Sequence, residues 1–208
     1  MKTPAAVQGE STEARLIAIA LKHFRRDGAA RTTIVRIAED AGMTHANVYR
    51  YFASKAALAE RIVSDWLRGI ELRLSDIVQA PDPADDKLER FLTVLARAYE
   101  EKAATDPAIF ALFVSAAQER ADHATRHRLR TRELLCRVLE EGLSTRVFTG
   151  GDVKRLERLV LDVAHRFIDP TALQQAFRPG RGKSDGRLDS RRDRVLRVLL
   201  RGLVGFRG

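Results

Sequence analysis

The sequence predicts an all-α protein, and three observations support this fold class. Along most of the 208 residues, apolar side chains recur at intervals of three or four, the spacing that places them on one face of a helix. Glycines, prolines and short polar residues stand between these stretches, at positions where helices begin and end. No segment shows the strict alternation of apolar and polar residues that is typical of a half-buried strand.

The N-terminal part predicts a unit of three helices. The first helix runs from Ser11 to Asp27, and Gly28 ends it. Two shorter helices are predicted over residues 34–41 and 45–51. The first helix has an apolar face that can cover the two short ones, formed by Leu16, Ile17, Ala20, Leu21 and Phe24.

A sharp turn is predicted between the two short helices. Thr33 and Thr44 each precede one of them, and a threonine hydroxyl there can accept a hydrogen bond from the open N–H groups of the first turn. Gly42 stands between the helices, where a left-handed backbone conformation costs glycine little. Two short helices joined in this way are typical of a helix-turn-helix, whose second helix enters the major groove of DNA.

The second short helix carries side chains suited to nucleic acid. Val48 and Phe52 are four residues apart and face inward. The remaining surface offers donors, acceptors and rings to base edges, sugars and phosphates, at His45, Asn47, Tyr49, Arg50 and Tyr51. Ser54 is expected to cap the next helix, whose first turn presents Lys55 to a phosphate group.

Longer helices are predicted beyond this unit. The first begins at Ser54 and continues to about Val78, so it connects the N-terminal unit to the rest of the chain. Asp106 and Pro107 are expected to open a later helix as its cap and first residue. The other predicted helices cover residues 85–104, 122–141, 152–167 and a last stretch through 195–203. The predicted domains are residues 11–55 and 56–208.

Composition excludes several classes of protein. The net charge is +9, and the positive charge is concentrated in residues 1–55 and 178–208. A basic N-terminal unit agrees with contact to phosphate. The basic C-terminal segment has two interpretations, a solvated helix face or a contact with nucleic acid or a membrane surface. A single cysteine excludes an internal disulfide framework, and neither a secretory signal nor an apolar run of membrane-spanning length is present, so a soluble cytoplasmic protein without a membrane contact is expected.

Two histidines raise the alternative of a metal-dependent helical enzyme. His123 and His127 are four residues apart and would share a helix face, but neither a third ligand nor an activating base can be identified. No Ser-His-Asp arrangement or glycine-rich phosphate loop has a useful spacing. We therefore expect no catalytic residue, no metal and no cofactor.

Aromatic residues of the central region have two interpretations as well. They are Trp66, Phe91, Tyr99, Phe110, Phe113 and Phe167. Such side chains either fill a helical core or line a ligand pocket between helices. His165 stands near Phe167 on an apolar helix face, where it would either hydrogen-bond a ligand or be a buried or half-buried histidine bonded to a carbonyl.

The N-terminal residues resemble the tetracycline-repressor (TetR) family. The matching residues are Thr33, Ile37-Ala38, Ala41-Gly42-Met43-Thr44, Val48-Tyr49, Tyr51-Phe52, Ser54-Lys55 and Leu58, and the likeness covers roughly residues 11–60. This chain departs from the family pattern at Ala46, where many members have glycine, and at Ala56, where many have glutamate. The departure at Ala46 changes how closely the backbone can approach DNA, so an operator preference is not transferable.

The resemblance implies a three-helix DNA-binding domain joined by a continuous helix to a helical domain that dimerises and binds a small-molecule effector. A repressor of a palindromic double-stranded operator is expected, with a DNA-binding regulator that lacks an effector as the alternative. The implied DNA-binding residues are Thr33, Thr44, His45, Ala46, Asn47, Tyr49, Arg50, Tyr51 and Lys55. The candidate effector residues are Trp66, Phe91, Tyr99, Phe110, Phe113, His165 and Phe167.

A homodimer is predicted to form through the helices around residues 152–167 and 190–203. Apolar side chains recur there at helical spacing, including Val195, Leu199 and Leu203. For control of DNA binding, an effector beside Trp66 is expected to shift the connecting helix and thereby change the separation of the two recognition helices.

Overall fold

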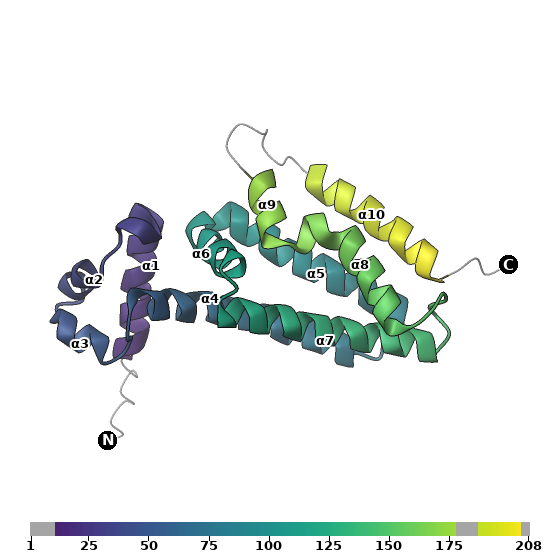
Figure 1. The fold of residues 1–208 in the computed structure, drawn as a ribbon, viewed down its shortest axis with the longest axis horizontal. Helices are drawn as coiled ribbons and strands as arrows, with labels where there is room; N and C mark the ends of the chain where they lie inside the picture. Colours follow the sequence, from purple (N-terminus) through teal and green to yellow (C-terminus); the bar gives the residue numbers. More distant parts are fainter. Residues whose placement is uncertain (1–10, 178–186, 205–208) are drawn as a thin grey trace, which may run out of the picture. The chain divides into compact units, whose positions relative to one another are not determined.

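The computed structural model describes residues 11–177 and 187–204, and all regular secondary structure within these ranges is α-helical, which confirms the predicted fold class. The helices are α1 (Thr12–Arg31), α2 (Ile34–Asp40), α3 (His45–Tyr49), α4 (Lys55–Gln79), α5 (Ala84–Thr105), α6 (Pro107–Gln118), α7 (Asp122–Ser144), α8 (Val153–Ile168), α9 (Pro170–Ala176) and α10 (Arg187–Val204) (Figure 1). The first part of the basic C-terminal segment, residues 178–186, lies outside the described residues. No helix of the described ranges is both long enough and apolar enough to cross a membrane.

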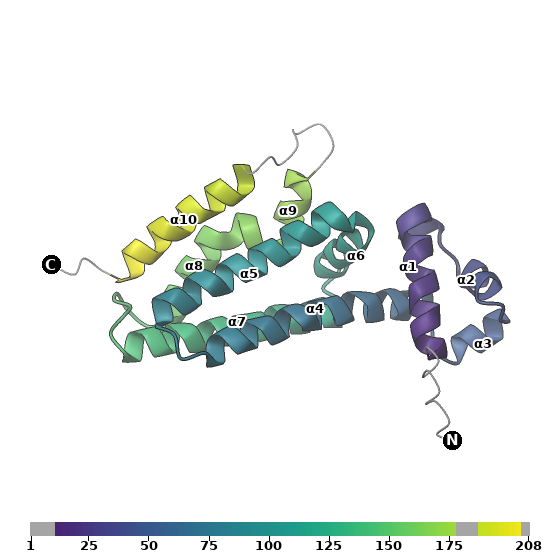
Figure 2. The same ribbon diagram turned by 180° about the vertical axis from the view of Figure 1, so that it is seen from behind.

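The chain divides into two compact units, Met1–Ile62 and Val63–Gly208. The division lies inside α4, whereas the sequence predicted a domain boundary at the start of that helix. In the first unit α2 packs against both α1 and α3 (Figure 2). The buried apolar side chains include Leu16, Ala20, Phe24, Ile37, Val48 and Leu58, which are the inward stripes that the spacing predicts.

Gly28 interrupts α1 rather than ending it. Its φ of 77° and ψ of 161° are not helical, and the N–H of Thr32 donates to its carbonyl at 3.2 Å. The predicted stop at Gly28 is therefore right for the regular helix, while one further turn continues to Arg31.

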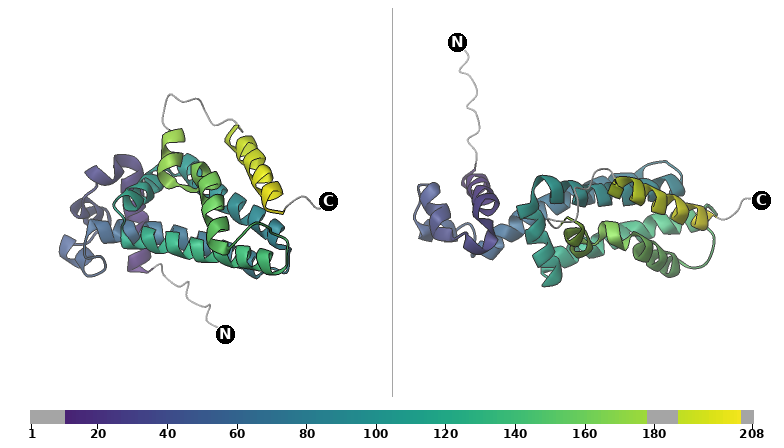
Figure 3. Two further views of the ribbon diagram at one scale, coloured as in Figure 1. Left: turned by 45° about the vertical axis from the view of Figure 1, so that its right-hand side comes forward. Right: turned by 90° about the horizontal axis from the view of Figure 1, so that it is seen from above.

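The second unit is a bundle in which α5 is central. It packs against α6, α7, α8, α9 and α10, and α8 in turn packs against α7, α9 and α10. Two views show α10 lying along α8 (Figure 1, Figure 3). The core is apolar and includes Leu74, Leu88, Phe91, Leu92, Leu134, Leu139 and Val160.

Two helix boundaries in this unit differ from the predictions. Asp106 does not cap α6 with its side chain, because its φ of −142° and ψ of 67° differ from the extended backbone of a typical cap, although Pro107 is the first helical residue as predicted. The short helix α9 was not predicted. Its start is nevertheless marked by Asp169, which accepts a hydrogen bond from the N–H of Ala172 at 2.8 Å, and by Pro170 in the first turn.

Gly142 lies inside α7, which continues beyond the end predicted at residue 141. A Cβ atom at this position would stand 2.0 Å from Cδ2 of Phe148, a separation that atoms do not tolerate. The glycine is therefore required by the close approach of the Phe148 ring, and α7 continues to Ser144.

Candidate functional sites

The turn between α2 and α3 has the geometry that the sequence predicts. Oγ1 of Thr33 accepts a hydrogen bond from the N–H of Arg36 at 3.3 Å, and Oγ1 of Thr44 accepts one from the N–H of Asn47 at 3.3 Å. Gly42 has φ 64°, in the left-handed region that glycine adopts at little cost. Both predicted caps and the predicted turn are confirmed.

The face of α3 presents polar and aromatic side chains to solvent. Val48 is fully buried, while Tyr49 is 49% and Tyr51 46% exposed. The other predicted DNA-binding residues of this segment are exposed or half-buried: Thr33, Thr44, His45, Ala46, Asn47 and Arg50. The helix ends at Tyr49, so Arg50 and Tyr51 lie in the turn after it and not within a helix over 45–51. The end comes early because the last turn tightens, with the N–H of Tyr51 donating to the carbonyl of Val48 at 3.0 Å.

Lys55 makes contacts within the first unit that the sequence did not predict. Its Nζ donates to the carbonyl oxygens of Ala29 at 2.6 Å and Thr32 at 2.9 Å. A cation satisfies the open carbonyls at the end of a helix, so Lys55 fixes the start of α4 to the end of α1. Contact of Lys55 with a phosphate stays a prediction. Ser54 accepts a hydrogen bond from the N–H of Ala57 at 3.0 Å, which confirms it as a cap.

A network of polar and charged side chains joins α1 to α2. His23 is 2% exposed, and its Nε2 lies 2.9 Å from Oδ2 of Asp40. Asp27 accepts two hydrogen bonds from Arg26, at 3.0 and 2.9 Å, and lies 3.2 Å from Nη1 of Arg36. The hydrogen bonds from Arg26, followed by the charges of Arg26 and Arg36, lower the pKa of Asp27 to about 2.

Replacing Asp27 by asparagine should lower the melting temperature near neutral pH but not in acid. Because the folded pKa of about 2 is below the ordinary value of 3.8, the carboxylate stabilises the folded protein above about pH 4 and loses this contribution as the pH falls through 2. Melting curves followed by circular dichroism should therefore differ at neutral pH and converge toward pH 2. Asp76→Asn, on the surface of α4, is the matched control. A difference that stayed constant with pH would contradict the role of the charge.

Four of the aromatic residues predicted for an effector site come together in the second unit. The ring of Trp66 on α4 lies 5.4 Å from that of Phe113 and 6.0 Å from that of Tyr99, measured between centroids. Phe113 also lies 5.3 Å from Tyr99 and 6.3 Å from Phe110. We call Trp66, Tyr99, Phe110 and Phe113 the aromatic cluster. Only Trp66 is half-buried, and Nζ of Lys102 stands 5.5 Å from its ring centroid.

Phe91, Phe167 and His165 do not join the aromatic cluster. Phe91 is 0% and Phe167 2% exposed, so both fill the core, and no ring pair within the described ranges links them to the cluster. His165 is exposed, although the sequence predicted a buried or half-buried position in the absence of a ligand. Helical spacing placed the two phenylalanines on buried faces but did not indicate which neighbours those faces meet.

His127 has partners that the sequence did not indicate. Its Nε2 lies 2.8 Å from Oη of Tyr99, and its Nδ1 lies 2.7 Å from Oε1 of Glu71, 56 residues away. The imidazole is 3% exposed and lies against the rings of Tyr99 and Phe113. In the part of the chain that the structure describes, no group of three or more His, Cys, Asp or Glu side chains is placed to hold a metal ion. The pairing of His123 with His127 at a metal therefore receives no support.

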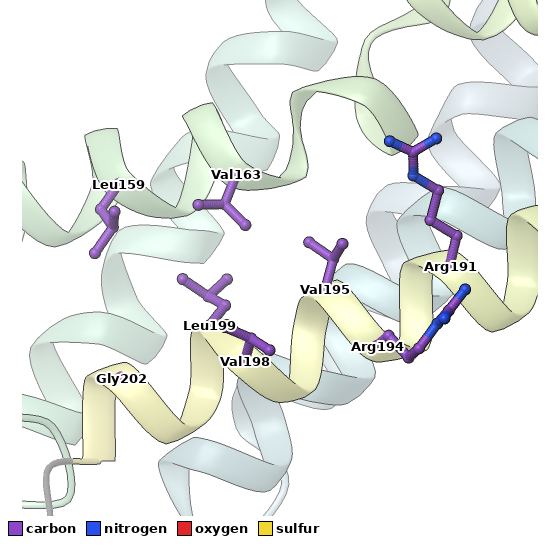
Figure 4. Close-up of a pocket in the computed structure, with 8 residues that line it drawn as sticks. All are labelled: Leu159, Val163, Arg191, Arg194, Val195, Val198, Leu199 and Gly202. Atoms are coloured by element: carbon purple, nitrogen blue, oxygen red, sulfur yellow. The ribbon is translucent and has the colours of Figure 1, made fainter.

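A groove of about 780 Å³ runs between α8 and α10 (Figure 4). Its lining is mainly apolar, with two arginines toward one end, and consists of Leu159, Val163, Arg191, Arg194, Val195, Val198, Leu199 and Gly202. Val198 is 72% and Leu159 46% exposed. Large apolar side chains that are exposed together on two adjacent helices are typical of a surface that another molecule covers.

Part of the apolar stripe predicted to face a partner copy is buried within the chain itself, whereas Val163 and Val195 are half-buried and line the groove. Leu199 is 6% and Leu203 1% exposed, and on α8 Val160 is fully buried. An apolar stripe marks the buried face of a helix but does not distinguish its own chain from a partner. The most exposed apolar side chains of the groove belong to the neighbouring row, which includes Leu159 and Val198.

Comparisons with known proteins agree with a helix-turn-helix unit followed by a helical unit. Residues 16–62 match the family model described as bacterial regulatory proteins of the tetR family, and residues 84–184 match the tetracyclin repressor-like C-terminal domain. The HTH-type transcriptional regulator TtgR of Pseudomonas putida is 27% identical over 188 residues, which cover 90% of this chain and 75% of TtgR. The probable HTH-type transcriptional regulator ArpR, also of Pseudomonas putida, is 27% identical over 199 residues, covering 95% of this chain and 80% of ArpR.

Solved structures share the fold over nearly the whole chain. A TetR/AcrR-family regulator of Thermobifida fusca superposes with a TM-score of 0.68 at 22% identity, covering 94% of this chain and 98% of that one. FadR of Bacillus subtilis, solved in complex with stearoyl-CoA, superposes with a TM-score of 0.66 at 16% identity and covers 91% and 98% of the two chains. With a helix-turn-helix in the first unit, a helical second unit and family matches in both, the chain belongs to the TetR family of transcriptional regulators.

Proposed function

We propose that this protein is a repressor that binds a palindromic operator as a homodimer and leaves it when a small molecule binds to the second unit. The main support is the face of α3. Val48 anchors this short helix to the core of the first unit. His45, Tyr49 and Arg50 are exposed to solvent, and Thr44 caps the start of the helix. A helix presented in this way reads base edges in the major groove, and the preceding helix crosses the phosphate backbone.

The groove between α8 and α10 supports the homodimer. Two copies related by a twofold axis would cover Leu159 and Val198 of each other, so that four helices form the interface. A twofold dimer places its recognition helices in successive major grooves, about 34–36 Å apart, and therefore recognises a palindrome.

Selection from a random pool of DNA duplexes tests this proposal directly. The enriched sequences should be palindromic, and titration should give two protein chains for each duplex. The affinity should fall steeply with salt, because Lys and Arg contacts to phosphate release counterions. Failure to enrich any sequence, or enrichment of asymmetric sites bound by a single chain, would contradict the proposal.

The aromatic cluster is proposed as the effector site. Trp66 is the single tryptophan of the chain, so its fluorescence reports directly on a compound that stacks beside it. Planar aromatic compounds that quench this fluorescence should also release the operator. By reciprocity, the operator should weaken their binding by the same factor, about 5- to 150-fold.

Trp66→Ala should weaken the binding of such a compound by about tenfold, because an aromatic contact contributes about 0.5–1.5 kcal/mol beyond the area that it buries. Calorimetry measures this affinity without the fluorophore, and Leu72→Ala on the exposed surface of α4 is the control. Equal affinity of wild type and Trp66→Ala would remove Trp66 from the site. Operator binding that no compound changes would favour a regulator without an effector.

A further inference from the structure

A row of three hydrogen-bonded side chains crosses the second unit from α4 through α7 to α5. Glu71 belongs to α4, His127 to α7 and Tyr99 to α5. The two hydrogen bonds measure 2.7 Å between Glu71 Oε1 and His127 Nδ1, and 2.8 Å between His127 Nε2 and Tyr99 Oη. The imidazole is buried, while the Glu71 side chain is 27% exposed. One buried histidine thus links three helices.

The chain of hydrogen bonds is complete in either protonation state of His127. A carboxylate only accepts hydrogen bonds, so Nδ1 donates to Glu71. A neutral imidazole then accepts the phenolic proton of Tyr99 at Nε2, and a protonated imidazole donates from Nε2 to the phenolic oxygen. Burial raises the pKa of Tyr99, which keeps its phenol protonated. The contact therefore persists across the physiological pH range and is suited to hold helices in place.

These hydrogen bonds hold α4, the helix that both units share. The part of α4 that precedes Val63 belongs to the first unit, where Lys55 ties it to α1. The part that follows belongs to the second unit and carries Glu71 and Trp66. A movement of α4 against α5 and α7 is therefore carried along a continuous helix that ends in the DNA-binding unit.

We propose that the hydrogen-bonded chain Glu71–His127–Tyr99 is a positioning lock that holds α4 against α5 and α7 and thereby sets the affinity for the operator. The proposal rests on the function proposed above. Buried polar groups contribute specificity of arrangement, because each bond is lost unless its partner stands in one place. An apolar contact at this point would lack this directional requirement.

Breaking the lock should reduce the fraction of dimers whose recognition helices have the correct separation. The apparent operator affinity falls by that fraction, whereas contact of one DNA-binding unit with phosphate does not depend on the separation. The lock therefore predicts a loss of specific binding without a loss of nonspecific binding. If the three residues only stabilised the fold, specific and nonspecific DNA binding would change equally.

The variants follow from the chemistry of each bond. Glu71→Leu removes the acceptor of Nδ1, and His127→Phe removes both bonds while keeping a ring in the space. Each should lower the affinity for the selected operator by about 5- to 150-fold, with the affinity for an unrelated duplex changed by less than about twofold. Glu71→Gln retains an acceptor oxygen and should restore most of the affinity.

An ion pair between a buried lysine and a half-buried glutamate provides a matched control. Nζ of Lys87 on α5 lies 2.7 Å from both carboxylate oxygens of Glu141 on α7, and the Lys87 side chain is 5% exposed. This pair joins α5 to α7 without involving α4. Lys87→Met should therefore lower the melting temperature but leave the operator affinity of the folded protein unchanged.

The decisive readout is the dependence on operator geometry. Fluorescence anisotropy is measured at a temperature where circular dichroism shows each variant folded, on the selected operator and on copies with one base pair inserted or removed between the half-sites. Wild type should discriminate strongly among these duplexes, and Glu71→Leu and His127→Phe should discriminate less. Unchanged or higher operator affinity in both variants, an equal loss on unrelated DNA, or an equal loss in Lys87→Met would each overturn the lock while leaving the proposed function intact. A wild type that binds no palindromic duplex would overturn the proposed function and the lock together.

Discussion

Val198→Arg should convert the proposed dimer to monomers and remove most of the operator affinity. Val198 is 72% exposed within one chain and lines the groove between α8 and α10, so the substitution leaves the folded chain intact but places a charge where the partner would pack. A charge without a partner in an apolar interface costs on the order of 3 kcal/mol or more, about a hundredfold in the dissociation constant of the dimer. Arginine is preferred to glutamate because Arg194 and Arg201, four residues before and three after, would pair with a carboxylate.

Light scattering over a range of protein concentrations measures the dimer directly. Leu129→Arg is the matched control, since Leu129 is 51% exposed on α7, outside the groove. Leu199→Arg is less informative, because Leu199 is 6% exposed and its replacement would disturb the chain itself. Monomers should bind a palindrome about 10²- to 10⁴-fold more weakly, because the second half-site is no longer held at a high local concentration. A Val198→Arg protein that remained dimeric would move the interface to another surface.

Asn47→Ala and Tyr49→Ala should each weaken operator binding by about 1–3 kcal/mol in a protein that remains folded. Tyr49 is 49% exposed and Asn47 half-buried on α3, so neither substitution opens a cavity in the core formed around Val48. In a dimer both copies lose the contact, which makes this the second large effect. Anisotropy with the selected operator measures the loss.

Nonspecific DNA separates base recognition from phosphate contact at these positions. The affinity for an unrelated duplex should change little, because side chains that read base edges contribute little to the phosphate term. Tyr49→Phe keeps the ring and removes the hydroxyl, and so indicates which of them contacts the operator. Full operator affinity in both alanine variants would exclude α3 as the recognition helix.

Most of the helices could be predicted because their signals are local. Thr33, Thr44, Ser54 and Asp152 lie immediately before helices and accept hydrogen bonds from first-turn N–H groups, as their positions in the sequence predict. The start of α9 carries the same local signal in Asp169 and Pro170. The side-chain cap predicted at Asp106 and the helix end predicted just before Gly142 are wrong because each residue type serves several structural purposes. The backbone at Asp106 does not have cap geometry, and Gly142 makes room for Phe148.

By itself the sequence determined that the protein is helical, that a helix-turn-helix opens the chain and which face of each helix is buried. These properties follow from spacing and end signals within a few residues. Only the tertiary structure decided which residues distant in the sequence are in contact. It brought His127 to Glu71 and Tyr99, Lys55 to the end of α1, and Trp66 to Phe113, but left His165 exposed. It also buried Leu199 within the chain and left Val198 exposed. The apolar stripe of a helix indicates that one face is covered, but the packing of the other helices determines what covers it.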